Sequence, residues 1–187
     1  MRQSLRAYGL RALAAAGLFA AMPALSVSAG AARINHGNDP FFQVSHAVSS
    51  CPVPLGPLQT EQEWLADSHY RIERGNSCWW EGRCRLSNSY LYDKEIQEAV
   101  NRRLTNIEAA THWREQTTLW LLLQRRFIYV QGCVGPEFDK RTFLSELAKT
   151  ADVERVIDET TAAPNAEALP YRTLDDPDKQ AYPHEGG

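Results

Sequence analysis

The sequence lacks the short motifs that mark common catalytic sites. It contains no G-x-S-x-G nucleophile motif, no H-E-x-x-H zinc motif and no glycine-rich phosphate-binding loop. Its five histidines are scattered along the chain, at His36, His46, His69, His112 and His184. His69 lies four residues before Glu73 on a predicted helix, a spacing that favours a surface ion pair over an acid–base couple. The sequence therefore predicts a protein that is not an enzyme and needs no cofactor.

Basic charge is also scarce. The 187 residues include 20 lysines and arginines against 23 acidic residues, which gives a formal net charge of −3. Residues 1–29 contain three arginines and no acidic residue, so their removal would change the net charge to −6. Nucleic-acid-binding domains usually carry a basic surface. We therefore expect no nucleic-acid partner.

A long apolar run occurs only near the N-terminus. Residues 12–25 are apolar apart from small breaks, and three arginines precede them: Arg2, Arg6 and Arg11. Val27-Ser28-Ala29 then supplies the small residues that a signal peptidase recognises. The run is short for a bilayer span. We predict a secretory signal peptide over residues 1–29; a cut after Ala31 fits nearly as well, and a retained membrane anchor is the alternative.

Cysteines are few, and all four follow the predicted cleavage site: Cys51, Cys78, Cys84 and Cys133. An even number in an exported chain implies two disulfides, with three possible pairings. We favour Cys78 with Cys84, because Gly82 eases closure of this short loop, and therefore Cys51 with Cys133. Zinc is the weaker interpretation, because the chain has no C-x₂-C pair and no histidines at ligand spacing.

The remaining chain predicts a mixture of helices and strands. Residues 32–57 are proline-rich and irregular. Thr60 and Glu63 form a capping box that begins a helix, and Gly75 ends it. Apolar periodicity predicts two further helices, at 93–107 and 139–151. Aromatic and branched residues predict a hairpin of strands 119–124 and 127–134 and a third strand at 152–157. Residues 161–187 form an acidic, proline-rich tail that we expect to be disordered.

Residues 93–157 resemble a BON domain, a small module of exported bacterial envelope proteins. The resemblance depends on three segments in the family's order: Tyr92-Asp93-x-x-Ile96, Ile128-x-Val130-x-Gly132-x-Val134, and Ala148-x-x-x-x-Val153-x-x-Val156. It implies a small α+β domain of order αββαβ over residues 91–160. The cysteines and the predicted helix before it indicate a disulfide-bonded, partly helical extension over residues 30–90. The chain departs from the family by having Gln124-Arg125-Arg126 in place of an Asp-Gly turn, and a cysteine after the strand glycine.

The resemblance also implies a location and a role. We expect a periplasmic protein, with secretion as the alternative, that binds without catalysis. The leading hypothesis is an envelope binding module that contacts anionic phospholipid, peptidoglycan or another envelope component. The alternative is a structural or accessory subunit of an envelope or secretion assembly, held by protein–protein contacts.

Strand alternation divides the predicted hairpin into two faces. One face, directed to the helices, carries Leu119, Leu121, Leu123, Ile128, Val130 and Val134. The other carries Trp120, Leu122, Phe127, Tyr129, Gln131 and Cys133, and is too apolar to contact water. We expect the N-terminal extension to cover it with the helix that contains Trp64. A disulfide from Cys133 to Cys51, or less favourably to Cys84, would attach this cover.

Tryptophans beside arginines mark the candidate binding surface. The cysteine-bounded loop carries Trp79, Trp80, Arg83 and Arg85, with Arg71 and Arg74 nearby, and the hairpin tip carries Arg125 and Arg126. Such groups suit either a lipid-headgroup interface or a protein hot spot. The simpler interpretation, which we favour from the sequence, is a disulfide loop with buried tryptophans and solvated arginines.

Overall fold

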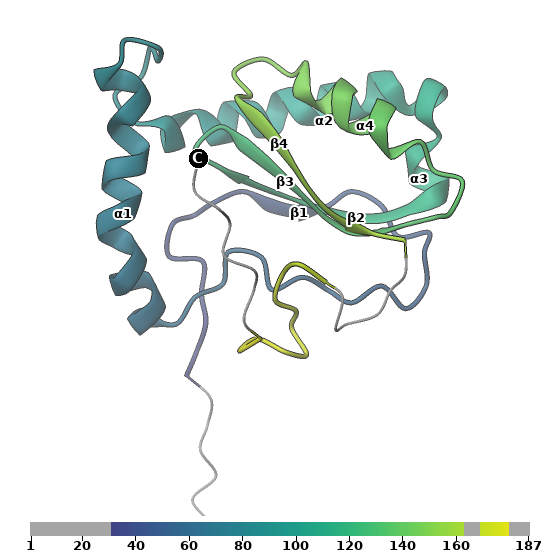
Figure 1. Ribbon diagram of the computed structural model, residues 1–187, viewed down its shortest axis with the longest axis horizontal. Helices are drawn as coiled ribbons and strands as arrows, with labels where there is room; N and C mark the ends of the chain where they lie inside the picture. Colours follow the sequence, from purple (N-terminus) through teal and green to yellow (C-terminus); the bar gives the residue numbers. More distant parts are fainter. Residues whose placement is uncertain (1–30, 163–168, 180–187) are drawn as a thin grey trace, which may run out of the picture. The chain divides into compact units, whose positions relative to one another are not determined.

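A four-stranded sheet lies at the centre of the computed structural model, which describes residues 31–162 and 169–179 (Figure 1). The strands follow one another in space as in the sequence: β1 (Phe41–Gln43), β2 (Thr117–Gln124), β3 (Phe127–Val134) and β4 (Arg155–Thr161). β1 and β3 pair antiparallel to β2, and β4 pairs parallel to β3. The mixed α+β class is confirmed, while the predicted signal peptide lies outside the described residues.

The β2–β3 hairpin is confirmed. Its turn forms without an Asp-Gly pair, and contacts with α2 stabilise it. Arg125 and Arg126 both have positive φ angles, 48° and 72°. A two-residue hairpin turn of this type requires positive φ at both positions, although this conformation is unfavourable for a residue with a Cβ atom. The carboxylate of Asp93 accepts hydrogen bonds from both backbone N–H groups, each at 2.8 Å. The first residue of α2 therefore holds the turn in place.

The described residues also form four α-helices: α1 (Glu61–Trp80), α2 (Asp93–Thr111), α3 (Trp113–Gln116) and α4 (Lys140–Ala148). A 3₁₀ turn (Ser89–Tyr92) precedes α2. The capping box of Thr60 and Glu63 is confirmed at the start of α1. The predicted end of this helix at Gly75 is wrong. Gly75 serves close packing instead, because a Cβ there would come within 2.6 Å of the Asn88 side chain.

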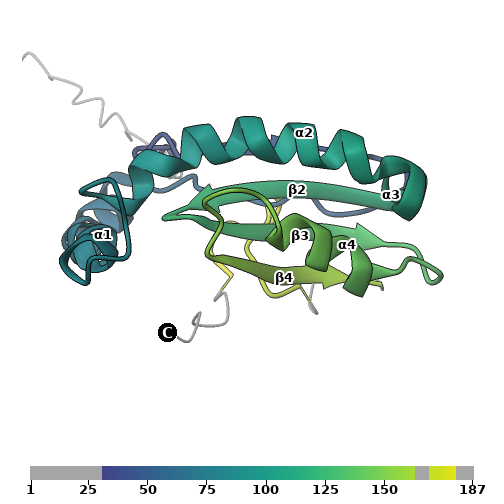
Figure 2. The ribbon, with the colours of Figure 1, turned by 90° about the horizontal axis from the view of Figure 1, so that it is seen from above.

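Helices α2 and α4 cover one face of the sheet (Figures 1 and 2). The face prediction is confirmed, because the main core cluster contains every strand residue assigned to the helices: Leu119, Leu121, Leu123, Ile128, Val130 and Val134. They join Ile96, Val100 and Leu104 of α2 and Phe143 and Leu147 of α4. Burying alternate strand residues against amphipathic helices provides most of the fold's hydrophobic stabilisation.

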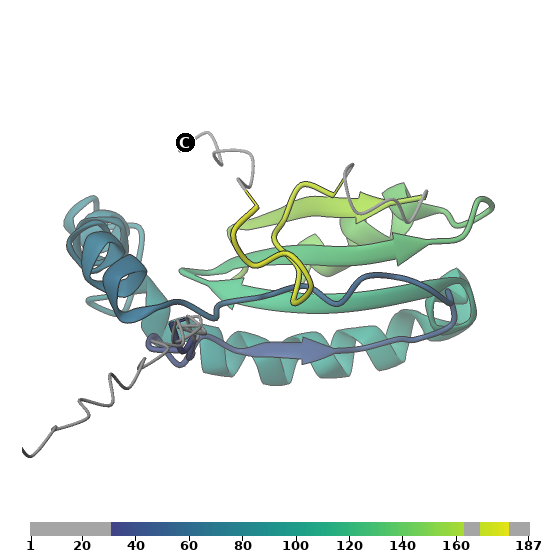
Figure 3. The ribbon, with the colours of Figure 1, turned by 90° about the horizontal axis from the view of Figure 1, so that it is seen from below.

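The opposite face of the sheet is covered, but by different segments from those expected. Residues 44–59 and 169–179 run across it, whereas α1 lies at one end of the sheet (Figures 1 and 3). The disulfide Cys51–Cys133 joins the first segment to β3, and Leu55 donates a backbone hydrogen bond of 2.8 Å to Arg172 in the second. The prediction that the Trp64 helix forms this cover is therefore wrong. The outer cluster itself is as expected, with Leu122, Phe127 and Tyr129 buried together.

The predicted disorder of residues 161–187 is wrong for 169–179; residues 163–168 and 180–187 lie outside the described residues. Leu169 and Tyr171 are 0% and 3% exposed, and Arg172 forms an ion pair of 2.6 Å with Glu63. Burial of two large side chains outweighs the polar composition of the segment. The predicted domain boundaries assigned the sheet to residues 91–160 alone. In the structure, residues 169–179 and the N-terminal extension both contact it.

Candidate functional site

Trp79 and Trp80 end α1 and are exposed to solvent, at 44% and 81%. The favoured prediction that they are buried is therefore wrong. The disulfide Cys78–Cys84 closes the following turn, and its sulfurs are buried while the tryptophans project outward. Both predicted disulfide pairings are confirmed.

The arginines after the tryptophans are engaged in ion pairs. Arg83 lies 2.6 Å from Glu81 and 3.3 Å from Glu154. Arg85 pairs with two carboxylates of its own, Glu95 at 2.7 Å and Asp152 at 3.3 Å. Glu81 raises the pKa of Arg83, and Glu95 raises that of Arg85, because each carboxylate stabilises the charged guanidinium.

Arg126 extends this network to the hairpin turn. Its guanidinium donates to the backbone oxygen of Asp152 at 2.8 Å, to Glu154 at 3.2 Å and to the sulfur of Cys84 at 3.0 Å. Arg125 points elsewhere, with its guanidinium 4.4 Å from the ring centre of Phe127 on the outer face of the sheet. The structure therefore brings Arg126 to the disulfide loop and separates Arg125 from it.

The arginine network has no excess of positive charge. Three guanidinium groups face four carboxylates, giving a formal charge of −1 for Arg83, Arg85, Arg126, Glu81, Glu95, Asp152 and Glu154. Attraction to an anionic bilayer depends on unneutralised basic groups near its surface. The network consequently offers little electrostatic affinity for anionic headgroups.

The buried face of α1 is set by an arginine. Arg71 is buried and donates two hydrogen bonds to the carboxylate of Asp39, at 2.9 and 2.7 Å. Its guanidinium also lies 5.2 Å from the ring centre of Trp64 and 4.0 Å from that of Tyr90. A paired guanidinium stacked on aromatic rings can replace apolar residues on an inward face.

Two aliphatic side chains of α1, Leu65 and Ile72, are exposed to solvent. Leu65 is 62% exposed and Ile72 61% exposed. Together with Trp79 they recur every seven residues, so they follow one side of the helix. We call Leu65, Ile72 and Trp79 the α1 stripe. The seven-residue spacing can be read from the sequence. Which side of the helix is buried follows only from the contacts that Arg71 makes in the structure.

Exposed apolar side chains are concentrated on this helix. Among the described residues, nine large hydrophobic side chains are exposed, and five of them lie on α1: Leu65, Tyr70, Ile72, Trp79 and Trp80. Single exposed hydrophobic residues are ordinary, whereas contiguous ones, such as Leu65, Ile72 and Trp79 along one side of α1, are typical of interaction surfaces.

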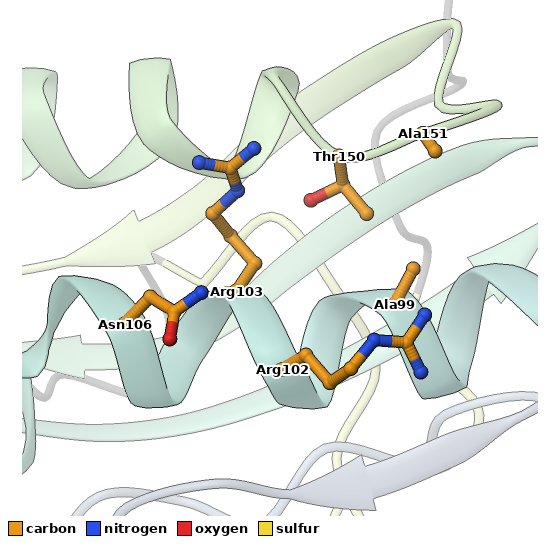
Figure 4. A pocket seen from close by; sticks show the side chains of 6 residues that line it. All are labelled: Ala99, Arg102, Arg103, Asn106, Thr150 and Ala151. Carbon is orange, nitrogen blue, oxygen red and sulfur yellow. The ribbon is translucent and has the colours of Figure 1, made fainter.

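A small pocket of about 230 Å³ lies between α2 and the end of α4, lined by Ala99, Arg102, Arg103, Asn106, Thr150 and Ala151 (Figure 4). Arg103 donates a hydrogen bond of 3.0 Å to the backbone oxygen of Lys149 and lies 3.7 Å from Glu146. It therefore satisfies a carbonyl at the C-terminal end of α4, where the helix dipole is negative. That field opposes an anion, so we assign the pocket no ligand.

Among the described residues, Asp93 and Glu159 carry buried carboxyl groups in addition to Asp39, which pairs with Arg71. Burial raises the pKa of Asp93 to about 7, against the effect of the two amide hydrogen bonds at the hairpin turn. Burial likewise raises the pKa of Glu159 to about 7, although the side-chain amide of Gln131 donates to it at 2.7 Å. Neither lines the pocket beside α4. His69 and Glu73 lie 3.2 Å apart at the surface, as predicted.

Within residues 31–162 and 169–179, no group of three or more histidine, cysteine or acidic side chains could hold a metal ion. No helix in the same part of the chain is both long and apolar enough to span a membrane. Comparison of the chain with protein-family models, with curated proteins and with solved structures finds no match.

Proposed function

We propose that this protein is an exported, non-catalytic module of the cell envelope that binds a protein partner through the α1 stripe and Trp80. One observation carries the proposal: more than half of the large exposed apolar side chains of the described residues lie on this single helix. Tryptophan is among the residues that contribute most to protein interfaces, with truncation to alanine costing about 2 kcal/mol or more at a hot spot.

The charges around the stripe favour a protein over an anionic bilayer. Glu61, Glu73 and Glu81 are exposed on or beside α1, and the nearby arginines are paired with carboxylates. A suitable partner has an apolar helix or groove with basic groups at its edge. Binding to phospholipid is the second candidate, because Trp80 is 81% exposed and tryptophan suits a headgroup region.

Two further observations support the export and the rigidity that this role needs. The disulfides Cys51–Cys133 and Cys78–Cys84 are typical of oxidising compartments, which agrees with the predicted signal peptide and a periplasmic or secreted location. The second disulfide and the buried Arg71–Asp39 pair hold α1 at both the middle and the end. A helix held in this way loses little conformational entropy when it binds.

Photo-crosslinking in native envelopes tests the proposal. A photoreactive amino acid replaces Ile72 or Trp79, and a control carries it at Glu98, which is exposed on α2. We expect ultraviolet light to yield protein adducts from positions 72 and 79 and not from 98. Adducts with lipid alone would favour the phospholipid candidate, and absence of any specific adduct would refute binding through α1.

A further inference from the structure

The two segments that cover the outer face of the sheet are attached to it in different ways (Figure 3). Residues 44–59 are joined to β3 by the disulfide Cys51–Cys133. Residues 169–179, which we call the lid, contain no cysteine and have no covalent crosslink to the sheet. The lid can therefore leave the outer face while residues 44–59 stay in place.

Backbone hydrogen bonds hold the lid to the tethered segment rather than to the strands. Leu55 donates to the backbone oxygen of Arg172 at 2.8 Å, and Leu174 donates to that of Val53 at 3.0 Å. The side chain of Arg172 also forms an ion pair of 2.6 Å with Glu63 at the start of α1. All of these contacts can break without separating one strand of the sheet from another.

A carboxyl group lies on the face that the lid covers. Glu159 of β4 is 3% exposed and follows Ile157 of the outer cluster by two residues, so both side chains lie on the same face. The amide of Gln131, its neighbour on β3, donates to it at 2.7 Å. From the lid, Tyr171 lies close enough for the charge of Glu159 to raise the pKa of its phenol. The lid thus helps to keep a carboxyl group out of water.

We propose that the lid is a pH-sensitive cover, which leaves the outer face of the sheet as Glu159 loses its proton. A carboxylate is costly to bury, and opening of the lid returns it to water. Opening also exposes the outer cluster of Leu122, Phe127 and Tyr129, which is buried when the lid is closed. This device lies apart from the α1 stripe and does not depend on the proposed function.

The burial of Glu159 sets the pH range of the device. Burial raises the pKa of this carboxyl from 4.5 to about 7, and the charge of the adjacent Asp158 adds to the rise. When the lid is open, water reaches the carboxyl and its pKa returns to the ordinary value. The closed lid is therefore most stable below about pH 4.5 and loses stability as the pH rises to about 7.

The other titratable groups around Glu159 leave this effect in place. Tyr129 and Tyr171 stay neutral over the range, because burial raises the pKa of both phenols. Arg125 and Arg155 lie over the ring of Phe127, four residues along the strands from the Gln131–Glu159 pair. In residues 44–59 the one histidine, His46, is exposed. The charged groups of the lid are directed elsewhere: Arg172 pairs with Glu63, Lys179 donates to the backbone oxygen of Leu169 at 3.0 Å, and Asp175, Asp176 and Asp178 are exposed.

Hydrogen exchange of single amides, followed by nuclear magnetic resonance, tests the lid. The amides of Leu55 and Leu174 report its opening, and the amide of Ala47, which donates to Thr117 at 2.9 Å, is the control on the tethered segment. After correction for intrinsic exchange, the opening constant at Leu55 and Leu174 should rise about 70-fold between about pH 5 and about pH 8. Ala47 should remain better protected than both at each pH, and Glu159→Gln should remove the rise.

A covalent clasp provides a second variant. Pro54 and Thr173 face each other in an antiparallel bridge, which brings their Cα atoms within disulfide range. Pro54→Cys combined with Thr173→Cys should therefore close the lid and lower exchange at Leu55 and Leu174 to the level of Ala47. If the three amides of the unclasped protein share one opening constant at every pH, the fold opens as a unit and the lid is overturned. A lid that opens independently, but with the same pH dependence in Glu159→Gln, would overturn the role of Glu159.

Discussion

The buried carboxyl of Glu159 should make the protein less stable as the pH rises. Glu159 is 3% exposed, and burial raises its pKa from 4.5 to about 7, with the charge of Asp158 adding to the effect. The native state then binds this proton more tightly than the unfolded chain does. The free energy of unfolding therefore falls between about pH 4.5 and pH 7 as the carboxyl ionises inside the fold.

The size of the effect follows from the two pKa values. The pKa of Glu159 differs by about 2.5 between the native and unfolded states. Once Glu159 is ionised in both states, this difference lowers the free energy of unfolding by about 3 kcal/mol. Glu159→Gln keeps the size of the side chain and an oxygen that accepts the Gln131 amide hydrogen bond, but it does not ionise. The variant should match the wild type at about pH 4.5 and be more stable by about 3 kcal/mol at about pH 8.

Urea unfolding followed by circular dichroism at both pH values measures this difference. Ionisation of Asp93 changes the free energy of unfolding in the same way in wild type and variant, so its effect cancels when the two proteins are compared. Glu63, whose pKa is lowered to about 2 chiefly by its hydrogen bond with Arg33, is ionised at both values and cancels too. A stability difference that is the same at both pH values would refute the assignment to Glu159.

Three further predictions concern stability and use thermal or urea unfolding. Leu169→Ala should cost about 2–4 kcal/mol because the side chain is fully buried, whereas Leu174→Ala at an exposed position should cost less than about 0.5 kcal/mol. Loss of Cys51–Cys133 should cost more than loss of Cys78–Cys84, about 4.5 against 2 kcal/mol, because the loops span 82 and 6 residues. Arg71→Ala should cost about 3–5 kcal/mol by leaving a buried carboxylate unpaired. Equal costs within either matched pair, or a neutral Arg71 variant, would contradict these explanations.

Much of the fold was readable from local patterns. The alternation of Leu119, Leu121 and Leu123 assigned the sheet faces correctly, because a strand has a strict two-residue period. The short spacing of Cys78 and Cys84 led to the right disulfide pairing. β1 was not predicted, because a strand of three residues at the edge of the sheet is too short to show the two-residue alternation of apolar side chains.

The candidate surface was harder to predict, because it depends on contacts between distant residues. The buried side of α1 is set by Arg71, whose partner Asp39 lies 32 residues earlier. Likewise, Arg83 and Arg126 look like free cations in the sequence, yet both pair with Glu154 in a distant loop. Composition also concealed Leu169 and Tyr171, which are buried within a segment that is otherwise polar.

Accessibility of the α1 stripe in isolated envelopes tests the central claim most directly. Ile72→Cys and Glu98→Cys each introduce one free thiol at an exposed position, and a maleimide reagent measures how fast each reacts. If a protein partner covers α1, the thiol at 72 should react at least tenfold more slowly than the thiol at 98. This protection should persist after mild detergent dissolves the bilayer. Equal rates at the two positions, or protection that disappears with the lipid, would contradict the account.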